Sequence, residues 1–213
     1  MTAPAFATPT PWRRIWTRPR ATLRSLVDAG PNHSALIISA GWGVVQSLLQ
    51  GAQNNVGARA PVFAILLMAI PIGALWGLLQ LYLLTGLFYL VGRWTGARVP
   101  FNHVRSVVAW ASLPLAATLG LWLVGTLVFG RSFFLDVDVV AATGQPGLLL
   151  SLGILYLATL GLCVWSLVIL IQGLAEVQRV SAAKAIGTVV AGLLMFGAAI
   201  LMVVAFMALV LWK

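Results

Sequence analysis

The sequence predicts an all-α integral membrane protein, a bundle of five transmembrane helices preceded by a short basic amphipathic interfacial helix. Of its 213 residues, 61% are hydrophobic and only 8% are charged, and the mean hydropathy is +1.02. A soluble domain carries about 25% charged residues, so this composition excludes a soluble enzyme. Five apolar stretches are each long enough to cross about 30 Å of hydrocarbon, which takes about 20 helical residues.

The five stretches follow one another with short polar segments between them. They run over about residues 35–52, 62–91, 104–129, 147–175 and 185–212. Apart from Arg105 at the edge of the third stretch, none contains Asp, Glu, Lys, Arg or His. The second stretch is too long for one straight span and contains Pro71, which removes a backbone hydrogen bond. It predicts a kink, or a start along the membrane surface before Pro71; a split into two spans is the other alternative.

Before the first stretch, the chain is divided into two parts. Residues 1–11 contain three prolines and are expected to form a mobile tail, whereas residues 12–30 have apolar residues at steps of three and four. Pro19 is expected to start a second short helix, and Gly30-Pro31 to stop it. This cytoplasmic amphipathic segment predicts docking to anionic lipid or to a partner, or simply a topogenic anchor. Its docking residues are Trp12, Arg13, Arg14, Trp16, Arg18, Arg20 and Arg24.

The charges between the spans predict the orientation of the remaining membrane domain, residues 31–213. Ten basic residues fall on one side: the five arginines of the N-terminal segment, then Arg93, Arg98, Arg105, Arg179 and Lys184. Only Arg59, Arg131 and Lys213 fall on the other side. By the positive-inside rule, the N-terminus is cytoplasmic and the C-terminus periplasmic. The 11 arginines and abundant Ala and Gly favour a bacterial cytoplasmic (inner) membrane.

The sequence contains no recognisable catalytic constellation. Ionisable residues inside spans mark proton relays and intramembrane catalysis, and the apolar cores have none. The Asp136-Val-Asp138 loop lacks the glycine and the last acid of a calcium-binding loop, and one cysteine makes no metal cluster. Glu176 is expected to form an ion pair with nearby Arg179, or to recognise a partner. We therefore predict no enzyme activity, no cofactor, no metal and no nucleic-acid partner.

Small residues spaced four apart predict close packing between helices. They are Gly73 and Gly77 in the second stretch, Ala116 and Gly120 in the third, and Gly187 and Ala191 in the fifth. Such pairs let two helix backbones approach closely, either inside the bundle or against another subunit. Gln46, Gln50, Gln80 and Gln172 are available for hydrogen bonds between helices or could line a polar cavity.

Three motifs resemble those of the bacterial branch of the Yip domain family. The first opens with Trp12-Arg-Arg-Ile-Trp16 and continues through Pro19, Arg20 and Arg24; the second has Gly92 and then Trp110 and Pro114. The third, residues 173–185, contains Glu176 and Lys184. The resemblance covers about residues 12–210 and implies five membrane helices with a cytoplasmic N-terminus. Eukaryotic relatives bind Rab GTPases in vesicle traffic. This chain lacks their longer tail with an acidic, Tyr-Gly-Pro-containing motif, so Rab binding is not implied.

From these features we predict a non-catalytic scaffold or accessory subunit of the membrane. Its expected partners are membrane lipids, above all anionic ones, and other membrane protein subunits or a second copy of itself. The alternative is a lipid-handling protein that binds headgroups or scrambles lipids, with the arginine segment controlling access.

Overall fold

In the computed structural model, residues 11–28 and 33–211 are described, and they contain helices and no β-strand. Five helical segments are long and apolar enough to span a membrane: His33–Gln53, Val62–Trp94, Phe101–Phe134, Pro146–Gln178 and Ala182–Leu209. The predicted all-α, five-span fold class is confirmed. The tail expected over residues 1–11, apart from Pro11, and the helix stop at Gly30-Pro31 lie outside the described residues.

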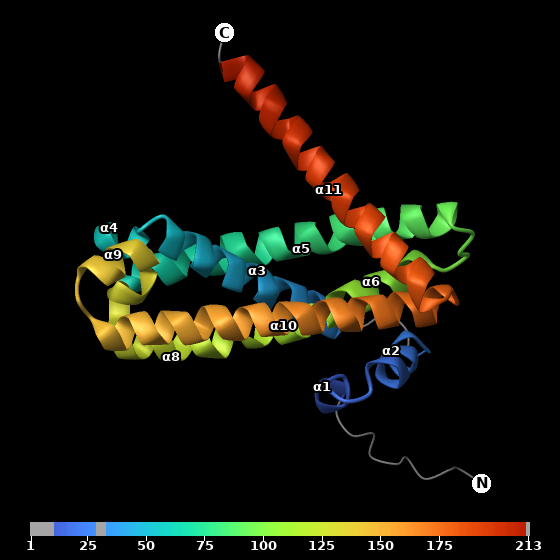
Figure 1. The fold of residues 1–213 in the computed structure, drawn as a ribbon, viewed down its shortest axis with the longest axis horizontal. Coiled ribbons are helices and arrows are strands. Elements are labelled where there is room, and N and C mark those ends of the chain that lie inside the picture. Colours follow the sequence, from blue (N-terminus) through green and yellow to red (C-terminus); the bar gives the residue numbers. More distant parts are fainter. Residues whose placement is uncertain (1–10, 29–32, 212–213) are drawn as a thin grey trace. The chain divides into compact units, whose positions relative to one another are not determined.

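Figure 1 shows the order of the elements along the chain. Two short helices, α1 (Pro11–Arg14) and α2 (Pro19–Asp28), precede the first long helix, α3 (His33–Gln53). The rest follow in the order α4 (Val56–Arg59), α5 (Val62–Trp94), α6 (Phe101–Ala111), α7 (Leu113–Ala117), α8 (Leu119–Phe129), a 3-10 helix η1 (Gly130–Phe134), α9 (Val137–Ala142), α10 (Pro146–Gln178) and α11 (Ala182–Leu211).

Two prolines in the spans have different outcomes. Pro71 lies inside α5, which is one helix of 33 residues, so the second stretch is not split into two helices. Pro114 instead lies in the first turn of α7, just after α6 ends. There, the hydroxyls of Ser112 and Thr118 donate to the carbonyls of Ala109 and Leu115, three residues earlier, at 2.7 and 2.6 Å. Three short helices therefore replace one long helix in the third span.

The third span also begins earlier than expected. Its first helix starts at Phe101, since the N–H of His103 bonds to the carbonyl of Pro100 at 3.1 Å. His103 and Arg105 therefore belong to a helix and not to the preceding loop. Arg105 is half-buried, and its guanidinium donates to the Tyr82 hydroxyl at 3.3 Å.

The described residues form two compact units. Unit 1 comprises the described residues within 1–31, 82–108 and 169–213, and unit 2 comprises those within 32–81 and 109–168. Long helices α5 and α10 contribute one end to each unit.

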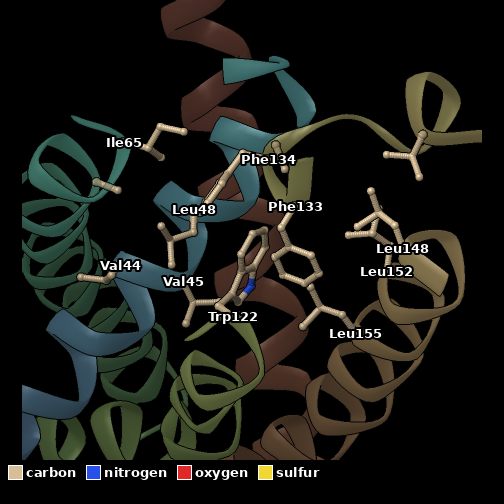
Figure 2. Close-up of a cluster of buried hydrophobic side chains, with 13 residues drawn as sticks. Val44, Val45, Leu48, Ile65, Trp122, Phe133, Phe134, Leu148, Leu152 and Leu155 are labelled. Atoms are coloured by element: carbon tan, nitrogen blue, oxygen red, sulfur yellow. The ribbon is translucent and has the colours of Figure 1, made fainter. Parts of the chain in front are cut away.

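Unit 2 has an aromatic core. The ring of Trp122 meets Phe133 edge-on at 5.3 Å and stacks on Phe134 at 5.8 Å between ring centres. Figure 2 shows Trp122 between Phe133 and the side chains of Val45 and Leu48 from α3. Leu148, Leu152 and Leu155 of α10 complete this cluster. Packing of this kind contributes about 0.5–1.5 kcal/mol per aromatic pair beyond the area that it buries.

The core of unit 1 includes the N-terminal helices. Ile15 and Leu23 are fully buried, and Leu26 and Val27 are nearly so. A Cβ added at Gly173 of α10 would lie 2.6 Å from both Leu23 and Val107, so these three residues are in close contact. The apolar face of α2 is therefore covered by protein.

Candidate functional site

The basic residues gather in unit 1. The ten that the sequence assigns to the cytoplasmic side all lie there, whereas Arg59 and Arg131 lie in unit 2. Lys213 is outside the described residues. Residues from the N-terminal helices, from the α5–α6 connection and from the α10–α11 connection thus belong to the same compact unit.

A cavity of about 480 Å³ opens among these basic residues. Arg20 and Arg24 come from α2, His103 from α6, and Glu176 and Arg179 from the end of α10. Apolar side chains complete its walls: Val27, Ala175, Val177 and Val180. The cavity therefore combines three guanidinium groups and one carboxylate with a partly apolar lining.

Glu176 pairs with a residue distant in the sequence. Its carboxylate accepts a hydrogen bond from Arg24 at 3.3 Å, and this is an ion pair across 152 positions. The expected pairing of Glu176 with Arg179 is therefore wrong. Arg179 follows the end of α10 and has a left-handed backbone, with φ of 52°, so it no longer continues the helical face of Glu176.

The left-handed position of Arg179 terminates α10. The N–H of Val180 bonds to the carbonyl of Ala175 at 3.1 Å, and the N–H of Arg179 points to the carbonyl of Glu176 at 3.4 Å. Helices commonly end at a residue with a left-handed backbone. That residue is usually glycine, because a residue with a Cβ atom is strained in this conformation. Arg179 therefore stands where the backbone favours glycine.

The predicted docking residues lie in two different places. Arg20 and Arg24 line the cavity, whereas the others lie on α1 and in the turn after it. Of those, Trp16 is half-buried and the rest are exposed: Trp12, Arg13, Arg14 and Arg18.

Two further arginines of unit 1 contact tyrosines, which sequence reasoning missed. The guanidinium carbons of Arg93 and Arg105 lie 5.8 and 5.9 Å from the ring centres of Tyr89 and Tyr82. The signal for Arg93 was available in the sequence, because Tyr89 precedes it by one helical turn. Tyr82 and Arg105 are 23 positions apart, and local spacing gives no sign of that pair.

The predicted small-residue pairs have different environments. Gly73 and Gly77 face the backbone of α3 around Gly43, with no space for side chains between the helices. Gly120 and Gly187 have no neighbour within 4 Å of an added Cβ. Their companions Ala116 and Ala191 are both half-buried. Gly43 was missed, although Ser39-x-x-x-Gly43 has the same small-residue spacing.

A polar cluster crosses the close contact between α3 and α5 in unit 2. The Gln46 amide donates to Gln80 at 3.0 Å and accepts from the Trp76 indole at 2.8 Å. A second cavity, of about 570 Å³, lies beside it and is lined by Gln46, Gln50, Trp76 and seven other residues. Two of the predicted glutamines thus form the expected bond between helices.

Among the described residues, no group of three or more His, Cys, Asp or Glu side chains could hold a metal ion. Cys163 is exposed on α10. Asp136 and Asp138 lie at the start of α9, where the Asp136 side chain accepts from the Asp138 N–H at 3.4 Å.

Comparison with known proteins identifies a protein family. The family model described as the Yip1 domain matches residues 13–211. The chain belongs to the Yip1 domain family. No curated protein and no solved structure gave a significant match.

In this Yip1 domain, the motif residues lie at packing and turning points. Gly92 lies beneath the side chain of Gln178, since an added Cβ would be 2.5 Å from the Gln178 amide nitrogen. Pro19 begins α2, the Trp110 side chain is buried in α6, and Pro114 follows the break after α6.

The last motif of the Yip1 domain forms the connection between α10 and α11. Glu176 holds Arg24 there, and Lys184 lies in the first turn of α11, where its N–H points to the Ser181 hydroxyl at 3.4 Å. The motif therefore supplies one wall of the basic cavity.

Proposed function

We propose that this Yip1 domain protein is a non-catalytic scaffold or accessory subunit that acts through helix–helix and lipid contacts in the bacterial inner membrane. The observation that carries the proposal is the exposure of α11, a helix of 30 residues that the other described residues of unit 1 cover only near its start.

The covered and uncovered faces of α11 are opposite each other. The buried residues are Ala185, Thr188, Val189 and Gly192, which share one face. At 100° per residue, Gly187 lies about 200° from Ala185, on the far side of the helix. Ala191 and Ala198 continue the small-residue line on that side. Helices in lipid associate by close packing along such lines, and no other described helix of unit 1 occupies this line along the exposed part of α11.

The gathering of basic residues in unit 1 supports a cytoplasmic docking surface. The ten basic residues in unit 1 would lie on the cytoplasmic side, where anionic lipid attracts each by about 1 kcal/mol. The N-terminus is then cytoplasmic and the C-terminus periplasmic. Fusion of a reporter that is active only in the periplasm to each end tests this orientation.

The placement of ionisable residues supports a non-catalytic role. In the five candidate spans, each Asp, Glu, Lys, Arg and His stands within five residues of an end. Residues that relay protons or catalyse reactions in a bilayer stand deeper, facing a cavity.

Cysteine crosslinking in native membranes tests the association. The only cysteine is Cys163, so a Cys163→Ala chain is a clean background for single cysteines. We expect Ala198→Cys, on the uncovered face, to crosslink to another protein or to a second copy. Thr188→Cys, on the covered face, is the matched control and should not. Absence of crosslinks along the whole uncovered face, together with a monomer after gentle extraction, would contradict the proposal.

The second candidate function is lipid handling, which the basic cavity of unit 1 specifically favours. A polar cavity at the end of the spans offers a binding place for a headgroup. The test is transport of labelled lipid in proteoliposomes, which should weaken when Arg20 and Arg24 are changed to Gln. If reconstituted protein moves no lipid, the transport part of this candidate is wrong.

A further inference from the structure

We propose that the unit 1 cavity is a binding site for a phosphomonoester group, with Arg20, Arg24 and Arg179 as its ligands. The inference deepens the lipid-handling candidate and rests on it for the membrane as the ligand's source. A soluble phosphomonoester has the same chemistry, and the experiment below distinguishes the two sources.

The charge of the cavity matches a phosphomonoester. The charges of its three arginines and one glutamate sum to two net positive charges. A phosphomonoester carries about −1.5 to −2 near pH 7, whereas a phosphodiester carries about −1. Binding of the monoester neutralises the lining, and binding of a diester leaves positive charge behind.

The arginines are held by separate parts of the fold. Arg24 is anchored by Glu176 at 3.3 Å, which is longer than the 2.7–2.9 Å typical of charge-assisted bonds. The bond to Glu176 uses one of the five N–H donors of Arg24, and the Arg24 side chain is 71% exposed. Arg20 precedes it by one turn of α2, and Arg179 enters from the end of α10. Guanidinium groups that line one cavity from two elements suit the several oxygens of a phosphate.

Backbone strain at Arg179 is an independent observation. Its left-handed conformation favours glycine, and Arg179 bonds to no carboxylate among the side chains that the structure describes. Strained residues cluster at ligand sites, where a side chain is needed in spite of the cost. The competing explanation is that Arg179 only offsets the negative end of the α10 dipole. The two explanations predict different behaviour for Arg179→Gly.

The size of the cavity suits a headgroup. Ligand sites are commonly about 300–1,000 Å³, and this one is about 480 Å³. It is larger than a phosphate alone, and Val27, Ala175 and Val180 give it an apolar side. A phosphate joined to a glycerol backbone therefore fits both the polar and the apolar parts of the lining.

The experiment measures lipid retention by the full-length protein in phosphatidylcholine nanodiscs. The discs contain either phosphatidic acid, a phosphomonoester, or phosphatidylglycerol, a phosphodiester, at equal total charge. We expect the phosphomonoester lipid to be retained more strongly, and Arg20→Gln or Arg179→Gly to weaken it by about tenfold, the typical effect of one charge-assisted hydrogen bond. Arg13→Gln, on α1 outside the cavity, is the matched control: it removes the same charge, so it should weaken retention of the two lipids by similar factors and leave the preference for phosphatidic acid intact.

Thermal stability without phosphatidic acid separates ligand binding from a structural role. Glycine relieves the strain at position 179, so Arg179→Gly should keep or raise the unfolding temperature while retention falls. Three outcomes would each overturn the proposal: equal retention of the two lipids together with no Arg179-dependent stabilisation by glycerol 3-phosphate, the same loss of preference in Arg13→Gln as in Arg20→Gln, or unchanged retention in Arg179→Gly. A fall in retention that accompanies lower thermal stability in Arg179→Gly would also overturn it.

A last arm identifies the source of the ligand. Glycerol 3-phosphate is added to protein in uncharged detergent, and its stabilisation of the wild type is compared with that of Arg179→Gly. Stabilisation that depends on Arg179, without preference for phosphatidic acid in nanodiscs, supports a soluble ligand and contradicts lipid handling. Retention of phosphatidic acid without lipid transport leaves the site standing and removes only the transport function.

Discussion

The contact between α3 and α5 allows the sharpest stability prediction, because no side chain separates the two backbones. A Cβ added at Gly73 would lie 2.6 Å from Val44 Cα and 2.7 Å from the Gly43 carbonyl oxygen. Carbon atoms in proteins prefer separations of about 3.5–4.0 Å. Gly73→Ala therefore requires the two helices to move apart by about 1 Å, since a backbone cannot rotate away as a side chain can.

The expected cost of Gly73→Ala is at the upper end of the range for overpacking. Inserting a methyl group into a filled contact typically costs about 1–3 kcal/mol. Separation of the helices also lengthens the Gln46–Gln80 bond of 3.0 Å and the Trp76–Gln46 bond of 2.8 Å. The gain in helix propensity from glycine to alanine, about 1 kcal/mol, partly offsets this cost.

Gly86→Ala is the matched control for Gly73→Ala. Gly86 is also in α5, and an added Cβ there has no neighbour within 4 Å. Both variants have the same propensity gain, so their free energies of unfolding should differ by the overpacking cost of about 1–3 kcal/mol. Unfolding by SDS in mixed micelles, followed by circular dichroism, measures this difference. Equal stabilities would refute the close backbone contact.

Three further predictions use the same unfolding assay. Gln46→Leu removes a bond to Gln80 and one to Trp76 and should cost about 0.6–2 kcal/mol, the range for polar contacts in lipid; no loss would mean that the cluster is not formed. Phe133→Ala should cost about 3–5 kcal/mol, because this ring is 2% exposed in the unit 2 core; a loss below 1 kcal/mol would contradict the core. Asn55 has φ of 55° and accepts from the Asp136 N–H at 2.9 Å. Asn55→Gly should therefore cost about 1 kcal/mol for the bond, and Asn55→Ala about 1–2 kcal/mol more for the left-handed backbone; the reverse order would contradict the geometry.

Hydropathy alone predicts the five spans, because each apolar stretch is long enough to cross a membrane and the breaks between them are polar. The interior of the third span was not predictable in this way. Pro71 and Pro114 have the same local effect on a helix, yet α5 continues through one and α6 ends before the other. Ser112 and Thr118, which bond to carbonyls three residues earlier, flank Pro114 and favour the break there.

Composition also predicts a basic docking end, but not which arginines form a cavity. The segment has five arginines, and only Arg20 and Arg24 line it. Their companions come from the end of α10, and the pair of Arg24 and Glu176 spans 152 positions. Sequence spacing reports neighbours within a turn or two of one helix, so contacts of this kind depend on the tertiary fold.

Burial of the α2 apolar face changes the expected mode of membrane contact. The sequence favours a segment that inserts its apolar residues among the headgroups, but Leu23 and Leu26 of α2, like Ile15 in the turn before it, are buried inside unit 1. Those apolar side chains have no exposed surface that could insert into the bilayer, so α2 contacts the membrane through its charged side chains. Attraction of about 1 kcal/mol per arginine is screened within about 10 Å at 0.1 M salt. Lipid contact through α2 should therefore weaken steeply with salt, whereas contact by apolar insertion would not.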